Sequence, residues 1–83
     1  MVDKKIHKKK LKVIVFGGSG FIGSHVAESL HKNGYQVTVA DLKKSKHLNK
    51  EILFQKVDIN NQKRVLNLVK NSSIVFNFAA IAD

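Results

Sequence analysis

The chain has 83 residues, of which 43% are hydrophobic, 15 are lysine or arginine and six are aspartate or glutamate, so its formal net charge is +9. This composition allows one small domain with an apolar core and excludes a wholly disordered chain. The absence of cysteine excludes disulfides and thiolate metal sites and is typical of a cytoplasmic protein. No apolar run approaches the roughly 18 residues of a membrane span, and no apolar segment of a secretory signal follows the first lysines.

Much of the positive charge lies in the first twelve residues, MVDKKIHKKKLK, where Asp3 is the only acid. We expect residues 1–10 to form a flexible basic tail, separate from a domain over residues 11–83. The alternative is an arm that binds nucleic acid, and deletion of the tail would then abolish salt-sensitive binding of DNA or RNA. No aromatic residues that could stack on bases are interleaved with these lysines, which disfavours this alternative.

The first predicted elements are a strand and a helix. Residues 11–16, LKVIVF, form a continuous apolar run that predicts a strand buried on both faces. From Phe21 the apolar positions recur every fourth residue, which predicts an amphipathic helix. Gly34 is well placed to end this helix in the left-handed conformation. The expected buried stripe consists of Ile22, Val26, Ala27 and Leu30.

Three more strands are predicted, at residues 35–40, 52–57 and 73–79. The polar segment 41–50, DLKKSKHLNK, is expected to be a loop. Strand, helix, strand, then strand, helix, strand predicts an α/β fold with a parallel sheet. In the usual doubly wound connection this gives a partial Rossmann fold with strand order 3-2-1-4 and flanking helices.

A second helix is predicted between the third and fourth strands. Asn60 or Asn61 can cap its N-terminus, and the sequence leaves both open. The expected apolar stripe consists of Val65, Leu66 and Val69.

The glycines between the first strand and the first helix carry the functional prediction. Gly17 allows a tight turn out of the strand, and Gly20, without a Cβ atom, lets a ligand approach the backbone. Gly23 lets the first helical turn press against the strand. The N–H groups of Phe21 and Ile22 would then point at an anion, with the helix dipole adding to the attraction. This arrangement suits the pyrophosphate of a dinucleotide.

An acid at the end of the second strand strengthens this prediction. Asp41 can accept hydrogen bonds from the adenosine ribose hydroxyls and would repel a 2′-phosphate, which favours NAD over NADP. Lys43 and Lys44 nearby could tolerate such a phosphate. The alternative for Asp41 is an ordinary aspartate at the end of a strand.

The segments GGSGFIGSHVAESL, VTVAD, VDIN and VFNFAA resemble the N-terminal part of the extended short-chain dehydrogenase/reductases. The resemblance is to the NAD-dependent epimerase/dehydratase family, whose members act mostly on nucleotide sugars, and it spans residues 11–83. It implies an NAD-binding Rossmann domain with a G-x-x-G-x-x-G fingerprint. The cofactor-binding residues that it implies are Gly17, Gly20, Phe21, Ile22, Gly23, Asp41, Asp58, Ile59, Ala79 and Ala80.

Some of these roles follow from the resemblance alone. Asp58 and Ile59 would flank the adenine ring, with the Asp58 carboxylate reaching the exocyclic amine. Ala79 and Ala80 would pass close to the pyrophosphate and the nicotinamide-side ribose. From the residues themselves, Asp58 could equally be a turn residue or a helix cap. Ala79 and Ala80 could simply be small packing residues.

Catalysis in the resembling family uses a Tyr-x-x-x-Lys pair. Tyr35 is the single tyrosine here, and the residue four positions later is Val39. We therefore expect no catalytic residue in this chain, which would be an NAD-binding fragment of a longer enzyme with a nucleotide-sugar substrate. A self-standing, non-catalytic dinucleotide-binding module is the alternative. The four histidines lack metal-ligand spacing, so no metal site is expected; they are His7, His25, His31 and His47.

The fourth predicted strand would lack an outer neighbour. An uncovered apolar strand edge can pair with another chain, so we expect marginal stability and self-association. The apolar residues concerned are Ile74, Val75, Phe76 and Phe78.

Overall fold

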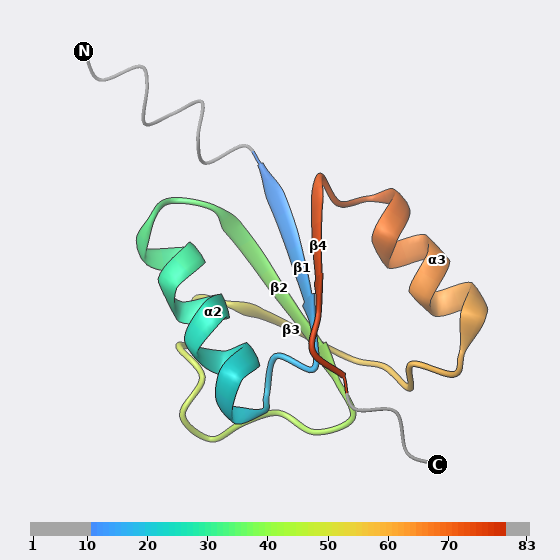
Figure 1. The fold of residues 1–83 in the computed structure, drawn as a ribbon, viewed down its shortest axis with the longest axis horizontal. Coiled ribbons are helices and arrows are strands. Elements are labelled where there is room, and N and C mark those ends of the chain that lie inside the picture. Colours follow the sequence, from blue (N-terminus) through green and yellow to red (C-terminus); the bar gives the residue numbers. More distant parts are fainter. Residues whose placement is uncertain (1–10, 80–83) are drawn as a thin grey trace.

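The computed structural model describes residues 11–79 of the chain. Its elements, in chain order, are β1 (Lys12–Phe16), α2 (Phe21–Lys32), β2 (Gln36–Asp41), β3 (Leu53–Lys56), α3 (Gln62–Lys70) and β4 (Ile74–Asn77). The four strands form one parallel sheet with the order β3-β2-β1-β4, as predicted (Figure 1). The predicted strand ends differ from these bounds by at most two residues.

Strand β1 lies inside the sheet, which explains why its sequence is apolar throughout. Val13 is paired with Val37 of β2 on one side and with Ile74 of β4 on the other. Helix α2 covers one face of the sheet and α3 the other (Figure 1). Side chains pointing to either face of β1 are therefore buried, as expected for an inner parallel strand.

The two faces of the sheet have separate cores. The buried residues of the α2 face are Val13, Val15, Ala27, Val37, Val39, Leu48 and Ile52. The buried residues of the α3 face are Ile14, Phe16, Ala40 and Val57. Alternate residues of β1 thus contribute to opposite cores, which follows from the two-residue period of a strand.

In each helix, one residue of the predicted apolar stripe is exposed instead of buried. Ile22 was expected to be buried, but it is 62% exposed, because the first turn of α2 puts Gly23 against the fold in its place. Leu66 was also expected to be buried and is 63% exposed. Leu68 replaces it in the core of the α3 face, together with Val65 and Val69, which restores the i, i+3, i+4 spacing of a helix face.

The helix ends agree with the sequence patterns, and the structure shows which of two asparagines caps α3. Gly34 has a φ of +92° directly after the C-cap Asn33, as predicted for the end of α2. Asn61, rather than Asn60, caps α3, because its side-chain oxygen accepts a hydrogen bond of 3.2 Å from the Arg64 N–H.

Strand β4 is an edge of the sheet within residues 11–79 and is hydrogen-bonded there to β1 alone. Val75 is 43% exposed, and Phe78, just after the strand, is 38% exposed. Ile74 and Phe76 are partly buried and pack against the core of the α2 face. Among the described residues, no helix has the length and hydropathy that crossing a bilayer requires.

Candidate functional site

The turn between β1 and α2 begins at a glycine that no other residue could replace without strain. Gly17 has a φ of +76°, and its N–H donates a hydrogen bond of 2.9 Å to the Ala40 carbonyl. A Cβ atom on Gly17 would lie 2.6 Å from the Ala79 nitrogen. The predicted tight turn is therefore present, and it brings the segment after β1 against the segment after β4.

The other three glycines of this turn differ in what surrounds them. A Cβ atom on Gly18 would lie 2.7 Å from both methyl groups of Val39, and one on Gly23 would collide with the Gly17 carbonyl oxygen. Gly23 therefore presses against the glycine turn itself rather than against the strand. A Cβ atom on Gly20 would meet only the Gly17 oxygen, at an ordinary 3.5 Å. The protein's own packing does not require glycine at position 20, so the space in front of this residue stays open.

The N-terminus of α2 faces this open space with unpaired donors. Gly20 is its N-cap and provides no side-chain cap, and the first turn contains no acidic residue. The first N–H groups of an α-helix have no partner within the helix, and here they belong to Phe21, Ile22 and Gly23. Together with the helix dipole they can stabilise an anion. The side chains of Phe21 and Ile22 are themselves exposed.

Asp41, the last residue of β2, directs its carboxylate toward the glycine turn. Its Oδ2 atom accepts a hydrogen bond of 3.0 Å from the Ser19 N–H, and Oδ1 accepts one of 2.7 Å from the Leu42 N–H. Ser19 in turn accepts a hydrogen bond of 3.2 Å at its Oγ atom from the Ser45 N–H. The predicted acid is therefore held beside the glycines, in a partly exposed position.

A cleft of about 820 Å³ lies at the carboxyl ends of the strands, next to these groups. This is where ligands bind in open parallel sheets. Six of the predicted residues line it: Gly17, Gly20, Asp41, Asp58, Ile59 and Ala79. The remaining lining residues are Phe16, Ala40, Leu42, Val57, Asn60, Asn77 and Phe78. Phe21, Ile22 and Gly23 are not in the lining and could contribute only through the backbone, and Ala80 lies outside the described residues.

Local hydrogen bonds explain two polar residues of the cleft. The Asp58 Oδ1 atom accepts a hydrogen bond of 2.9 Å from the Asn60 N–H, so this residue does form the turn that was its alternative role. Its other carboxylate oxygen accepts no hydrogen bond from the residues 11–79 that the structure describes. Asn77 is exposed, and its Oδ1 atom accepts a hydrogen bond of 3.0 Å from the Ala79 N–H.

The sequence analysis missed Ser19 and the apolar wall of the cleft. Ser19 lies between two fingerprint glycines, so its backbone position was predictable, but its two contacts depend on where the segment after β2 runs. Phe16, Ala40 and Val57 stand at the ends of β1, β2 and β3. Their place in the lining follows once parallel strand ends are known to meet at one edge.

Comparison with known proteins identifies the family of this chain. Residues 13–83 match the model of the NAD dependent epimerase/dehydratase family. The chain belongs to this family. The fold described above is that of the N-terminal part of its members, as the resemblance in the sequence implied.

Individual members of the family match most of this chain. GDP-mannose 3,5-epimerase 1 of Oryza sativa subsp. indica is 33% identical over 75 residues, which cover 87% of this chain and 20% of that protein. The structure of UDP-glucose 4-epimerase with UDP-glucose from Thermotoga maritima is 38% identical, with a TM-score of 0.73, over 87% of this chain and 25% of that one.

A third relative was solved with the cofactor. The UDP-glucose 4-epimerase of Thermus thermophilus in complex with NAD is 35% identical, with a TM-score of 0.72, over 88% of this chain and 25% of that one. The chain therefore spans about a fifth to a quarter of these epimerase/dehydratase relatives.

The positions of the tyrosine and of the possible metal-ligating side chains bear on the chemistry of this chain. Tyr35 is partly buried and packs against the core of the α2 face, away from the residues that line the cleft. Within residues 11–79, no three histidine, aspartate or glutamate side chains are grouped so that they could hold a metal ion.

Proposed function

We propose that this chain binds NAD at the cleft between the glycine turn and Asp41, as the nucleotide-binding part of an epimerase/dehydratase-type oxidoreductase. The observation that carries the proposal is the open space at Gly20. Every other glycine of the turn is needed for packing or for a positive φ, whereas Gly20 faces unpaired helix N–H groups and an empty approach. A site shaped in this way accepts a phosphate group close to the backbone.

The rest of the cleft fits the remaining parts of a dinucleotide. The Asp41 carboxylate would accept hydrogen bonds from the adenosine ribose hydroxyls, and the free oxygen of Asp58 would accept one from the adenine amine. Ile59 would lie against the flat ring, and Ala79 and Ala80 would pass near the pyrophosphate and the second ribose. The backbone N–H groups of Phe21, Ile22 and Gly23 would hold the pyrophosphate itself. These are the residues that the sequence predicted, and the cleft lining supports six of them.

The position of the Asp41 carboxylate favours NAD over NADP. A 2′-phosphate on the ribose would approach the Asp41 carboxylate and be repelled. Lys43 and Lys44 are exposed on the following segment and lower this repulsion without removing it.

When bound, NAD supplies a hydride acceptor. Oxidation of a nucleotide sugar, the substrate class named for the relatives, also requires a group that moves a proton. This chain has a single tyrosine and no Tyr-x-x-x-Lys. We infer that its own residues bind and orient the cofactor, and that proton transfer and substrate binding belong to parts of the relatives that this chain does not span.

Calorimetric titration of the full chain with NAD tests the proposal. We expect saturable binding with a stoichiometry of one, competition by ADP-ribose, and weaker binding of NADP. A folded chain that binds neither NAD nor ADP-ribose contradicts the proposed function.

A second property follows from β4. Because this strand is bonded to β1 alone within residues 11–79 and carries exposed apolar side chains, we infer that copies of the chain self-associate through this edge.

A further inference from the structure

Asn77 is the last residue of β4 and one of the polar residues that line the cleft. It is registered with Phe16 of β1, and Phe16 is registered with Ala40 of β2. Registered residues of neighbouring strands point to the same face of a sheet. Phe16 and Ala40 belong to the core of the α3 face and line the cleft, so the Asn77 side chain extends this row of the lining.

A turn after β4 fixes the orientation of the Asn77 amide. The Ala79 N–H donates a hydrogen bond of 3.0 Å to the Asn77 Oδ1 atom. Because a backbone N–H can only donate, the side-chain atom that faces it must be the amide oxygen. The Nδ2 atom, with its two N–H donors, therefore lies on the other branch of the amide. It makes no hydrogen bond within residues 11–79.

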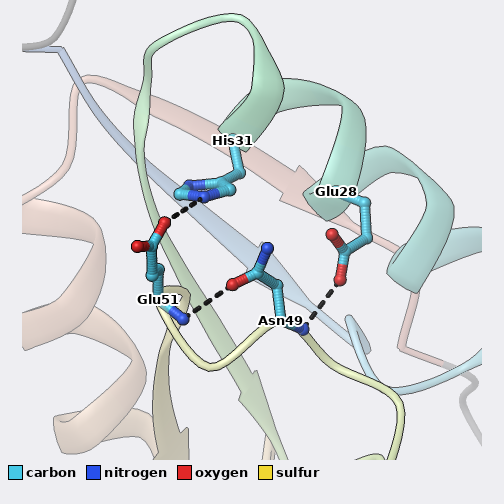
Figure 2. A network of polar contacts seen from close by, with 4 residues as sticks. All are labelled: Glu28, His31, Asn49 and Glu51. Carbon is cyan, nitrogen blue, oxygen red and sulfur yellow. Dashed lines mark hydrogen bonds and ion pairs between the residues drawn. The ribbon is translucent and has the colours of Figure 1, made fainter.

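Asn49 forms the same kind of turn in the connection between β2 and β3. Its Oδ1 atom accepts a hydrogen bond of 2.8 Å from the Glu51 N–H, and its Nδ2 atom points away from that bond (Figure 2). The acids around it have partners: Glu28 accepts from the Asn49 N–H at 2.8 Å, and Glu51 contacts the His31 ring at 3.1 Å. That network fastens the connection to α2, whereas the turn at Asn77 leaves amide donors beside the cleft.

Hydrogen-bond donors are scarce among the side chains of this cleft. Within residues 11–79, no lysine or arginine lines it, and its polar side chains are those of Asp41, Asp58, Asn60 and Asn77. Ionised carboxylates only accept hydrogen bonds, so the two asparagines are the lining side chains that can donate. Asn60 follows β3 at one edge of the sheet, and Asn77 ends β4 at the other.

Of these two donors, Asn77 is the one beside the glycine turn. β4 pairs with β1, which leads into this turn, and a Cβ atom on Gly17 would lie 2.6 Å from the Ala79 nitrogen. The Ala79 N–H is bonded to Asn77, and the Phe78 N–H is bonded to the β1 backbone at 2.8 Å. Within residues 11–79, the Asn77 Nδ2 atom therefore carries the donors that the end of β4 can offer to a ligand.

We propose that Asn77 is a further cofactor-binding residue, whose Nδ2 atom donates a hydrogen bond to a phosphate oxygen of the bound dinucleotide. The oxygen of this amide holds the turn, and its nitrogen holds the ligand. A neutral amide can do both, whereas a carboxylate at the same position would repel a phosphate. This inference rests on the proposed function. It adds a side-chain contact to phosphates that the proposed function assigns to backbone N–H groups alone.

Asn77→Asp separates the two ends of the amide. The aspartate still accepts from the Ala79 N–H, so the chain should unfold at the same or a higher denaturant concentration. It no longer donates and it repels phosphate, so we expect NAD to bind about tenfold more weakly or worse. The loss should shrink as salt is added. Calorimetric titration of the full chain and of the variant with NAD measures it.

A second variant and a matched control exclude other causes. Asn77→Ser keeps an oxygen for the Ala79 N–H without adding charge, and it should weaken NAD binding about fivefold through the lost amide donor. Asn67→Asp makes the same amide-to-carboxylate change at an exposed position of α3 outside the cleft lining. Its Oδ1 atom also accepts there, from Asn71 Nδ2 at 3.0 Å. Its NAD affinity should stay within about twofold of the unmodified chain.

Titration with ADP, which carries both phosphates and no second ribose, locates the contact. The loss caused by Asn77→Asp should be at least as large for ADP as for NAD. A loss confined to NAD and ADP-ribose would place Asn77 at the second ribose and overturn the phosphate contact. Folded Asn77→Asp and Asn77→Ser chains that bind NAD normally, or an equal loss in Asn67→Asp, overturn this inference alone. If the unmodified chain binds neither NAD nor ADP-ribose, the proposed function fails and this inference with it.

Discussion

Asp41 at the end of β2 and Ser19 in the glycine turn are joined by a hydrogen bond of 3.0 Å from the Ser19 N–H to the Asp41 Oδ2 atom. The two residues come from neighbouring strands, because β1 leads into the turn and β2 pairs with β1. A carboxylate has about four acceptor positions, and Ser19 and Leu42 occupy two of them. The acid is thus oriented in advance and keeps two acceptor positions, which in the proposed complex receive the ribose hydroxyls.

Replacement of Asp41 should change both the affinity and the choice of cofactor. We expect Asp41→Ala to weaken NAD binding about 10- to 100-fold, since hydrogen bonds to a charged group contribute about 1.5–3 kcal/mol. NADP should lose less affinity, because the repulsion of its 2′-phosphate also disappears. Titration with both cofactors measures the ratio. An Asp41→Ala chain that is folded and binds NAD normally would show that the ribose does not lie at Asp41.

The lysines that follow Asp41 give the complementary prediction. Lys43→Ala combined with Lys44→Ala should lower the affinity for NADP and leave that for NAD within about twofold, because only NADP carries a phosphate near them. The difference should shrink as salt is added. Equal losses for both cofactors would place the lysines near the pyrophosphate instead.

Gly20 and Gly23 should respond in opposite ways to a methyl group. Gly20→Ala adds a group in open space, so the free energy of unfolding should change by less than about 1 kcal/mol, while NAD binding weakens at least tenfold. Gly23→Ala pushes a group into the Gly17 and Gly18 backbone and should lower the unfolding free energy by about 2 kcal/mol or more. Chemical denaturation and titration of both variants measure this. Unchanged NAD binding by Gly20→Ala would contradict the phosphate site.

Much of the fold could be predicted from short-range patterns. The succession of strands and helices, with the usual doubly wound connection, predicted the sheet order, and the glycines and the acid after β2 predicted the candidate site at the carboxyl ends of the strands. The patterns failed where burial depends on tertiary position. Leu66 and Leu68 are equally apolar, and only the orientation of α3 on the sheet buries the second. The segment 41–50 was predicted only as a polar loop, since no local pattern indicates that its Asn49 bonds to Glu28 of α2.

The cap of α3 can be tested with a matched pair of neighbours. Asn61→Ala removes the acceptor of the Arg64 N–H and should lower the unfolding free energy by about 1 kcal/mol. Asn60→Ala is the control, because Asn60 bonds to the Asp58 carboxylate through its backbone N–H, and it should change stability by less than about 0.5 kcal/mol. Thermal or denaturant unfolding measures both. A larger effect of Asn60→Ala would place the cap one residue earlier.

Self-association should depend on the β4 edge. Val75→Lys puts a charge on this edge and should shift the chain toward a smaller species in sedimentation velocity, as charged edge residues oppose strand pairing. Leu53→Lys on β3, the opposite edge, is the control, since Leu53 is also exposed and β3 already carries Lys56. A monomeric unmodified chain, or an equal response to both substitutions, would contradict pairing through β4.

The packing of Gly17 against Ala79 joins the turn after β1 to the residues that follow β4. During synthesis the glycine turn emerges early, yet the wall that faces it exists only after β4 has docked beside β1. A molecule seated between them bridges both parts, so its binding energy adds to the stability of the sheet formed by β1 to β4. The cellular concentration of such a molecule would then help to determine what fraction of these chains is folded at all.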